Sequence, residues 1–347
     1  MKRLLCILAL LCFTLPTLAS CNTGRGTEPQ STEFYEYFDT VSIVQSYLGD
    51  SKESFNKNCA LVRSVLEKYH RLFDIYYEYS GINNLRTVNR NAGKAPVKVD
   101  GELIDFLLYC KDMYTLTRGE TNIAIGAVTK IWHDKREAAI KSPATANLPM
   151  YNELLEASEH TSIDLIVINE EESTVYISDT KASIDVGAIG KGYAAEMAKK
   201  ALIYAGVTSY VLNIGGNICC IGNKASGDKW RTAIKDPLTS GAYALTVYLS
   251  DITCVTSGSY QRYFTVDGVK YHHLIDKDTL MPSVCFTSVT VFCESSALAD
   301  ALSTALFCMT YEEGLSLVST LEGVNVFWIA PDGTEYMTDG VCEFINK

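Results

Sequence analysis

The stretch IDVGAIGKGYAAEMA, residues 184–198, places three glycines around a lysine, a pattern that could hold a phosphate. Gly187, Gly190 and Gly192 are spaced GxxGxG, whereas the dinucleotide-binding fingerprint is GxGxxG, and a P-loop has Ser or Thr where this chain has Gly192. A glycine turn that opens a helix still presents unpaired backbone N–H groups, and the helix dipole favours an anion there. The stretch therefore predicts an anion site at a helix start, although such turns are also common without a ligand.

A second stretch, ALADALSTAL, carries a carboxylate and a hydroxyl four positions apart, at Asp300 and Thr304. Residues at this spacing share one face of a helix, and both side chains offer the hard oxygen ligands that Mg²⁺ prefers. The surrounding residues are apolar, so a buried Asp300 needs a partner, and a metal ion is one candidate. The alternative is a capped or solvated helix face.

A third stretch, YHHLID, places His273 and Asp276 at the end of an expected strand. An imidazole of ordinary pKa suits a general base near neutral pH. The alternative is a structural or exposed histidine.

The elements that must position these residues alternate without a strict strand–helix–strand order. Apolar and β-branched patterns predict helices over 52–73, 101–117 and 297–309, a helix from the glycine stretch to near Gly206, and a further helix after Tyr311. Strands are expected over 34–48, 164–178 (a hairpin), 209–222 (with a tight turn), 230–237, 242–258, 263–276, 287–293 and 325–333, whereas 119–132 reads as a loop leading into an apolar segment. This mixture predicts an α+β fold with a mostly antiparallel sheet.

The N-terminal residues are typical of an export signal. A positive start at Lys2 and Arg3, a short apolar run, and Leu18-Ala19-Ser20-Cys21 resemble a bacterial lipobox, in which the cysteine becomes lipidated. We therefore expect a lipoprotein signal peptide over 1–20, a flexible tether over 21–33 after lipidated Cys21, and one domain over 34–347. Export and anchoring to the extracytoplasmic face of a bacterial membrane follow; an ordinary signal peptide with an incidental cysteine is the alternative.

Charge and cysteine content narrow the functional classes. The formal net charge is −11, which disfavours nucleic acid as a partner and requires a local cation for any anionic ligand. Nine cysteines follow Cys21, an odd number without any CxxC pair, which argues against a full disulfide framework and a structural zinc site.

Taken together and in order, the motifs resemble the ApbE family of FAD:protein FMN transferases, also described as flavin-trafficking lipoproteins. The resemblance runs from about residue 34 to 310 and rests on FDTVS, YSGINNL with VNRNAG, RGETNIAIGAVTKIW, IDVGAIGKGYAAEMA, YVLNIGGNI, TSGSYQRYF, YHHLID with DTLMP, and SVTVF with SALADALSTALF. It implies a single T-fold-related α+β domain, FAD as the substrate, Mg²⁺ as the cofactor, and redox-protein subunits outside the cytoplasm as acceptors.

The resemblance also implies roles for individual residues. Asp300, Thr304 and the backbone carbonyl of Ala188 correspond to the metal ligands, and His273, oriented by Asp276, corresponds to the group that acts on the acceptor hydroxyl. The FAD-contacting positions are Phe38, Tyr76, Asn122, Asp185, Lys191, Gly215, Gly216, Ser257, Gly258 and Ile275. Phe38, Asn122 and Gly187 depart from the commonest family pattern, and Asn122 removes a charge from the expected flavin pocket.

Transfer of FMN from FAD to a Thr or Ser hydroxyl of an acceptor protein, with release of AMP, is therefore the leading functional hypothesis. A metal-dependent FAD pyrophosphatase would use the same residues with water as the acceptor. A non-enzymatic FAD-binding lipoprotein, and an apolar-pocket lipoprotein unrelated to flavin, are the remaining alternatives.

Overall fold

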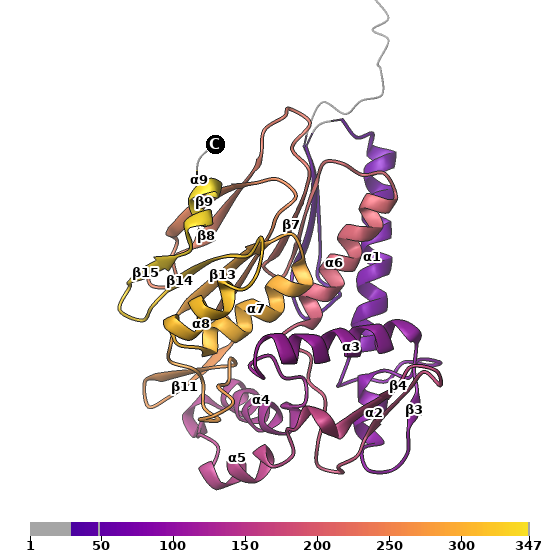
Figure 1. Cartoon of the computed structure of the whole chain (residues 1–347), viewed down its shortest axis with the longest axis vertical. Helices are drawn as coiled ribbons and strands as arrows, with labels where there is room; N and C mark the ends of the chain where they lie inside the picture. Colours follow the sequence, from indigo (N-terminus) through magenta and orange to yellow (C-terminus); the bar gives the residue numbers. More distant parts are fainter. Residues whose placement is uncertain (1–28, 48, 346–347) are drawn as a thin grey trace, which may run out of the picture.

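The computed structural model describes residues 29–47 and 49–345 (Figure 1). The expected signal peptide, the lipidation site at Cys21 and most of the expected tether lie outside this part of the chain. Strand β1 begins at Gln30, so the last residues of the expected tether already belong to the folded domain. No helix in the described residues combines the length and apolar character that crossing a membrane requires.

An eight-stranded antiparallel sheet forms the centre of the molecule, in the order β1-β2-β6-β7-β10-β13-β14-β15. Its strands are Gln30–Phe34 (β1), Ser42–Ser46 (β2), Tyr210–Ile214 (β6), Asn217–Ile221 (β7), Thr253–Gly258 (β10), Ser288–Cys293 (β13), Asn325–Ile329 (β14) and Glu335–Met337 (β15). Strand β13 is buried along its whole length, and this includes its two polar residues, Ser288 and Thr290. The α+β class and the mostly antiparallel sheet expected from the sequence are confirmed.

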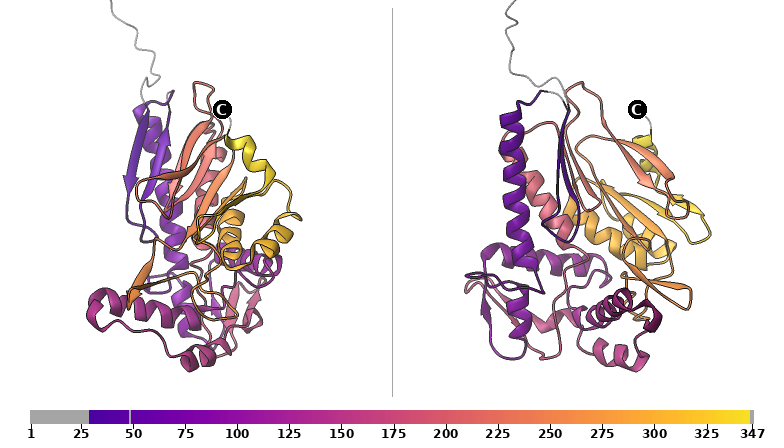
Figure 2. Two further views of the ribbon diagram at one scale, coloured as in Figure 1. Left: turned by 90° about the vertical axis from the view of Figure 1, so that its left-hand side faces the viewer. Right: turned by 180° about the vertical axis from the view of Figure 1, so that it is seen from behind.

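Three helices, Lys52–Phe73 (α1), Gly190–Tyr204 (α6) and Ser296–Cys308 (α7), pack side by side, with α6 and α7 against the central strands of the sheet (Figures 1 and 2). Eleven of the thirteen residues of α7 are buried, so a carboxylate on this helix must find a partner inside the fold. The other face of the sheet is covered by the hairpin Trp230–Lys235 (β8) and Tyr243–Leu249 (β9) and by the short helix Cys342–Ile345 (α9). Helix Tyr311–Val318 (α8) packs through Leu317 and Val318 into the same core as α7.

A second group of elements lies beyond the end of the sheet, in the lower part of Figure 1. It contains the helices Leu85–Arg90 (α2), Gly101–Leu116 (α3), Gly126–Lys141 (α4) and Tyr151–Ser158 (α5), a small sheet of Val97–Lys98 (β3), Ile166–Asn169 (β4) and Thr174–Ile177 (β5), and the hairpin Tyr263–Val266 (β11) and Val269–His272 (β12). Short 3₁₀ turns occur at Pro143–Thr145, Ile163–Leu165 and Asp339–Val341. Helices α4 and α5 and the β11–β12 hairpin share a small apolar core of their own, built around Trp132 and Phe264.

Two expectations from the sequence are corrected by the structure. The strand expected over 34–48 is interrupted, because Phe38 and Asp39 adopt left-handed backbone angles with φ of 57° and 50° and the chain turns between β1 and β2. The segment expected to be a loop before Trp132 becomes helix α4 from Gly126 onward. Helix α4 has no side chain that accepts a hydrogen bond at its N-cap, so the usual start signal of a helix is missing from the sequence.

Candidate active site

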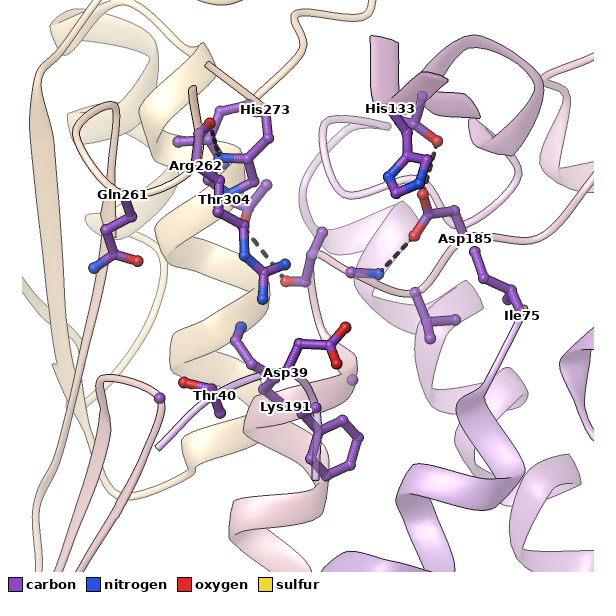
Figure 3. A pocket seen from close by; sticks show the side chains of 18 of the residues that line it. Asp39, Thr40, Ile75, His133, Asp185, Lys191, Gln261, Arg262, His273 and Thr304 are labelled. Atoms are coloured by element: carbon purple, nitrogen blue, oxygen red, sulfur yellow. Dashed lines mark hydrogen bonds between the residues drawn. The ribbon is translucent and has the colours of Figure 1, made fainter. Parts of the chain in front are cut away.

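A cavity of about 600 Å³ lies between the end of the central sheet and the α4–hairpin group (Figure 3). Its wall is built from the loop between β1 and β2, the segment after α1, the start of α4, the turn before α6, the β6–β7 turn, the β11–β12 hairpin and α7. Thirteen of the fifteen positions expected to contact substrate or metal line it: Phe38, Tyr76, Asn122, Asp185, Ala188, Lys191, Gly215, Ser257, Gly258, His273, Ile275, Asp300 and Thr304. Segments far apart in sequence therefore converge on one site.

The junction of helices α6 and α7 fixes Asp300. The backbone N–H of Gly192 donates to Oδ2 of Asp300 at 2.7 Å, and Nζ of Lys191 lies 3.8 Å from Oδ1. A Cβ atom on Gly192 would lie 2.2 Å from Cβ of Asp300 and 2.5 Å from the Ser296 carbonyl oxygen, so only glycine allows this approach of the two helices. Gly192 of the GxxGxG pattern therefore serves a helix contact.

Thr304 follows Asp300 by one helical turn, and its Oγ1 lies 3.4 Å from the carbonyl oxygen of Ala188. A carboxylate, a hydroxyl and a backbone carbonyl thus meet at the cavity wall, and all three are hard oxygen donors of the kind that binds Mg²⁺. Within residues 29–47 and 49–345, no group of three His, Cys, Asp or Glu side chains could hold a metal ion. The mixed donor set fits a Mg²⁺ ion that keeps water or substrate oxygens as its other ligands.

Asp185 holds the turn that carries Ala188 into α6. Its Oδ1 accepts from the backbone N–H of Gly187 at 2.9 Å, and its Oδ2 accepts from Oγ1 of Thr129 at 2.7 Å. The carboxylate therefore ties the turn to helix α4 across the cavity floor. Its position on the wall still allows a ligand to contact it (Figure 3).

The two adjacent histidines have different environments. His272 is buried, and its Nε2 donates to the Ser283 carbonyl oxygen at 2.9 Å, so it is a structural residue. Nδ1 of His273 lies 3.3 Å from the carbonyl oxygen of Arg262. A carbonyl can only accept, so this contact places the proton of the neutral ring on Nδ1 and leaves the Nε2 lone pair free.

Desolvation in the cavity wall, together with the charges of Arg262, Lys191 and His272, lowers the pKa of His273 to about 3. The ring is therefore neutral at physiological pH and able to accept a proton. A bound polyphosphate would offset the two cations and raise the pKa of His273 toward a value more useful for a general base.

Asp276 lies in the turn after the hairpin and outside the cavity wall. Its Oδ1 accepts from the backbone N–H groups of Asp278 and Thr279, at 3.0 and 2.7 Å, and from Oγ1 of Thr279 at 2.9 Å. Within the described residues no hydrogen bond joins Asp276 to His273, and the Arg262 carbonyl occupies the orienting position instead. The local sequence DKDT thus forms a turn that shapes the segment after His273.

Gly215 and Gly216 form the two-residue turn between β6 and β7, where Ile214 pairs with Asn217. Both glycines have positive φ, 60° and 98°, as the favoured two-residue hairpin turn requires. Gly215 lines the cavity and Gly216 does not. A Cβ on Gly215 would lie 2.5 Å from Oγ1 of Thr40, so this turn packs directly against the loop that carries Phe38.

Asn122 and Tyr76 also line the cavity. The Asn122 side chain donates to the Thr161 carbonyl oxygen at 2.9 Å and accepts from the Ala124 N–H at 2.8 Å, a pair of bonds that a carboxylate could not make. The Tyr76 ring lies 5.2 Å from the His133 ring, and burial raises the pKa of Tyr76 to about 12, so its hydroxyl stays protonated.

Sequence reasoning missed several residues that line the cavity, among them His70, Glu120, Trp132, His133, Arg136 and Arg262. Arg262 could have been found from the sequence. The DG turn at Asp267–Gly268 predicts a hairpin, and its register pairs Tyr263 with His272, which places Arg262 opposite His273. His70 and Arg136 follow no local signal, because they come from helices whose orientation depends on tertiary packing.

The cavity wall carries more acidic than basic side chains. Six carboxylates, Glu36, Asp39, Asp74, Glu120, Asp185 and Asp300, face three permanent cations, Arg136, Lys191 and Arg262. Two cations behind the wall pair with it, Arg63 with Glu36 at 3.0 Å and Lys277 with Glu120 at 3.3 Å. Six carboxylates face three cations on the wall itself, so a strongly anionic ligand needs additional positive charge to bind.

The fold and the cavity define an α+β protein with one large pocket, whose wall brings together oxygen donors from Ala188, Asp300 and Thr304. A model of the ApbE family matches residues 39–328, and the chain belongs to this family. It is 33% identical over 275 residues to the FAD:protein FMN transferase of Treponema pallidum (strain Nichols), an alignment that covers 76% of this chain and 75% of the relative.

Solved structures agree with this assignment. The crystal structure of the ApbE protein from Thermotoga maritima is similar to this chain with a TM-score of 0.79 and 25% identity, over 92% of this chain and all of that one. The flavin transferase ApbE from Vibrio cholerae is similar with a TM-score of 0.76 and 23% identity, over 91% and 99% of the two chains, and supports the fold.

Proposed function

We propose that this protein transfers FMN from FAD to a threonine or serine hydroxyl of an acceptor protein and releases AMP, with Mg²⁺ as the cofactor. The convergence of Asp300, Thr304 and the Ala188 carbonyl beside His273 carries the proposal. The name of the Treponema pallidum relative, FAD:protein FMN transferase, supports it. The cavity volume of about 600 Å³ is within the range of sites that enclose cofactor-sized ligands.

The metal site would consist of the Asp300 carboxylate, the Thr304 hydroxyl and the Ala188 carbonyl. When bound there, Mg²⁺ would supply positive charge to the pyrophosphate of FAD, which the acidic wall does not provide. The chain itself contributes positioning. Gly192 holds Asp300 through its N–H, and Asp185 holds the turn that presents the Ala188 carbonyl.

His273 would act as the general base. Its Nδ1–H is engaged by the Arg262 carbonyl, so Nε2 is the atom that accepts the proton of the acceptor hydroxyl. The hydroxyl oxygen forms a bond to the FMN phosphorus, and the bond from this phosphorus to the bridging oxygen breaks. The bridging oxygen leaves with the electron pair as part of AMP, and the proton on Nε2 later passes to solvent.

Export and lipid anchoring through Cys21 also belong to the proposal. The lipobox-like LASC and the polar segment after it support them. Metabolic labelling with a radioactive fatty acid should label the full chain, and Cys21→Ser should remove the label and release the protein from the membrane fraction. Equal labelling of both forms would contradict the anchor.

One experiment tests the transferase against its alternatives. Purified protein is incubated with FAD, Mg²⁺ and a candidate acceptor domain, and the mass of the acceptor is measured. A mass increase of one FMN less one water, together with AMP, supports transfer. FMN and AMP released with an unmodified acceptor would mean hydrolysis, and bound FAD without AMP would mean storage.

A further inference from the structure

One cation of the cavity differs from the other two in lacking a counter-ion. Lys191 lies 3.8 Å from Asp300, and Arg136 lies 3.7 Å from Glu137. Among the described residues, no carboxylate lies within ion-pair distance of the Arg262 guanidinium. Figure 3 shows the Arg262 side chain extended into the cavity, on the same wall as His273 and Thr304. Arg262 is an exposed residue that lines the cavity, so its guanidinium is accessible there and is not committed to a carboxylate of the chain. It is therefore available to an anionic ligand.

The β11–β12 hairpin gives this guanidinium a defined place relative to the proposed base. The register pairs Tyr263 with His272, so Arg262 and His273 are neighbours across the open end of the hairpin. The Arg262 carbonyl bonds to the ring of His273. Arg262 thus orients the imidazole of His273 through its backbone carbonyl, and its side chain lines the cavity.

The β11–β12 hairpin packs on helix α4, and this packing fixes the positions of Arg262 and His273. Phe264 and Tyr271 pack on Trp132 of helix α4, with ring centroids 6.3 and 6.2 Å away. Nε1 of Trp132 donates to the Leu280 carbonyl oxygen at 2.9 Å. The aromatic cluster therefore fixes the base of the hairpin against α4, while its open end faces the cavity.

We propose that the Arg262 guanidinium binds the non-bridging oxygens of the FMN phosphate, the group that is transferred, and stabilises the charge on it as the acceptor attacks. This inference rests on the proposed function and adds a substrate-contacting residue to it. The guanidinium lies on the same wall as His273, as expected if it binds the phosphate that is attacked by the hydroxyl that His273 deprotonates. It keeps all its protons during the step, while the acceptor proton moves to Nε2 of His273 and the electron pair of the broken bond leaves with AMP.

A binding experiment without metal or acceptor isolates this contact. Wild type, Arg262→Ala and Arg262→Lys are titrated with FMN, riboflavin and AMP, and binding is followed by flavin fluorescence or calorimetry. Arg231→Ala, which removes an exposed charge from β8 on the other face of the sheet, is the matched control. Circular dichroism checks that every variant is folded.

We expect Arg262→Ala to weaken FMN binding roughly tenfold or more, as for the loss of a charge-assisted contact, and to leave riboflavin binding unchanged. Arg262→Lys should recover part of the loss, and the control should bind FMN as wild type does. In the transfer assay with Mg²⁺, Arg262→Ala should lower kcat about 10²- to 10³-fold.

Two results would overturn the assignment: unchanged FMN binding in Arg262→Ala, or a selective loss of AMP binding, which would place the guanidinium on the leaving group. A wild-type protein that binds neither FMN nor FAD would instead refute the proposed function. The two failures are therefore distinguishable.

Discussion

The contact between Gly192 and Asp300 leads to a quantitative prediction for the substitution Gly192→Ala. The added Cβ would lie 2.2 Å from Cβ of Asp300 and 2.5 Å from the Ser296 carbonyl. Carbon atoms pack at about 3.5–4.0 Å, so helices α6 and α7 must separate locally by more than about 1 Å. Overpacking of this kind costs about 1–3 kcal/mol, and the higher helix propensity of alanine returns up to about 1 kcal/mol.

We therefore expect Gly192→Ala to lower the free energy of unfolding by up to about 3 kcal/mol. The separation would also pull the Asp300 carboxylate away from the Gly192 N–H, so FMN transfer should require a higher Mg²⁺ concentration. Gly101→Ala is the matched control, because Gly101 opens helix α3 with no atom within 4 Å of the new Cβ. The control should leave stability unchanged or raise it by up to about 1 kcal/mol.

Urea denaturation followed by circular dichroism measures both variants under identical conditions. The Mg²⁺ dependence of transfer is measured on the folded proteins. A Gly192→Ala variant as stable as Gly101→Ala would refute the close approach of α6 and α7, and with it the account of how Asp300 is positioned.

Three further predictions concern the same site. Asp300→Asn preserves the shape of the side chain but removes the charge, and should lower Mg²⁺-dependent transfer at least about 100-fold, whereas Asp267→Asn in the exposed β11–β12 turn should match wild type in the same mass assay. His273→Gln should lower kcat about 10²- to 10⁴-fold while FAD affinity, measured by fluorescence, stays within a few-fold; a loss confined to affinity would argue against a general base. Stability should also depend on pH through His273: its folded pKa is about 3 against an ordinary 6.5, so the unfolded chain binds more protons between these values and stability falls as pH falls through 6.5. The upper limit of this loss at pH 5 is about 2 kcal/mol, and denaturation at pH 7.5 and 5 should show a smaller loss for His273→Gln than for wild type.

Helical periodicity made part of the site predictable. Asp300 and Thr304 are four residues apart in an apolar run, and this spacing was enough to place both on one face, which lines the cavity. The type and approximate bounds of most strands and helices also followed from apolar patterns, including helix α1 over Lys52–Phe73.

What the sequence could not predict depends on contacts between distant segments. The Gly192 N–H reaches Asp300 across 108 positions, and no local pattern distinguishes this glycine from one in an ordinary turn. A backbone carbonyl ligand such as that of Ala188 requires no particular side chain, so the sequence pattern cannot reveal it. Only the resemblance to a family suggested this ligand. The left-handed conformation of Phe38 is equally hidden, since an aromatic residue is typical of a strand and not of a break.

For Asp276, the neighbouring sequence predicts the structure better than the resemblance to the family, which implied that Asp276 orients His273. The sequence DKDT is typical of a turn in which an aspartate accepts from the backbone two and three residues on. The structure has this turn, and the side chain is thereby committed to it.

The small core shared by α4, α5 and the β11–β12 hairpin has a consequence for how a bulky product could leave. This unit carries one wall of the cavity, and its own core contains six buried apolar side chains, whereas strand β13 and helix α7 are enclosed in the larger cores. Partial opening should therefore cost much less free energy here than global unfolding. In native-state hydrogen exchange, amides of β11 and α5 should exchange well before those of β13. If this unit opens while the central sheet stays folded, the cavity gains a second exit. A flavin covalently attached to an acceptor protein could then be released without global unfolding of the enzyme.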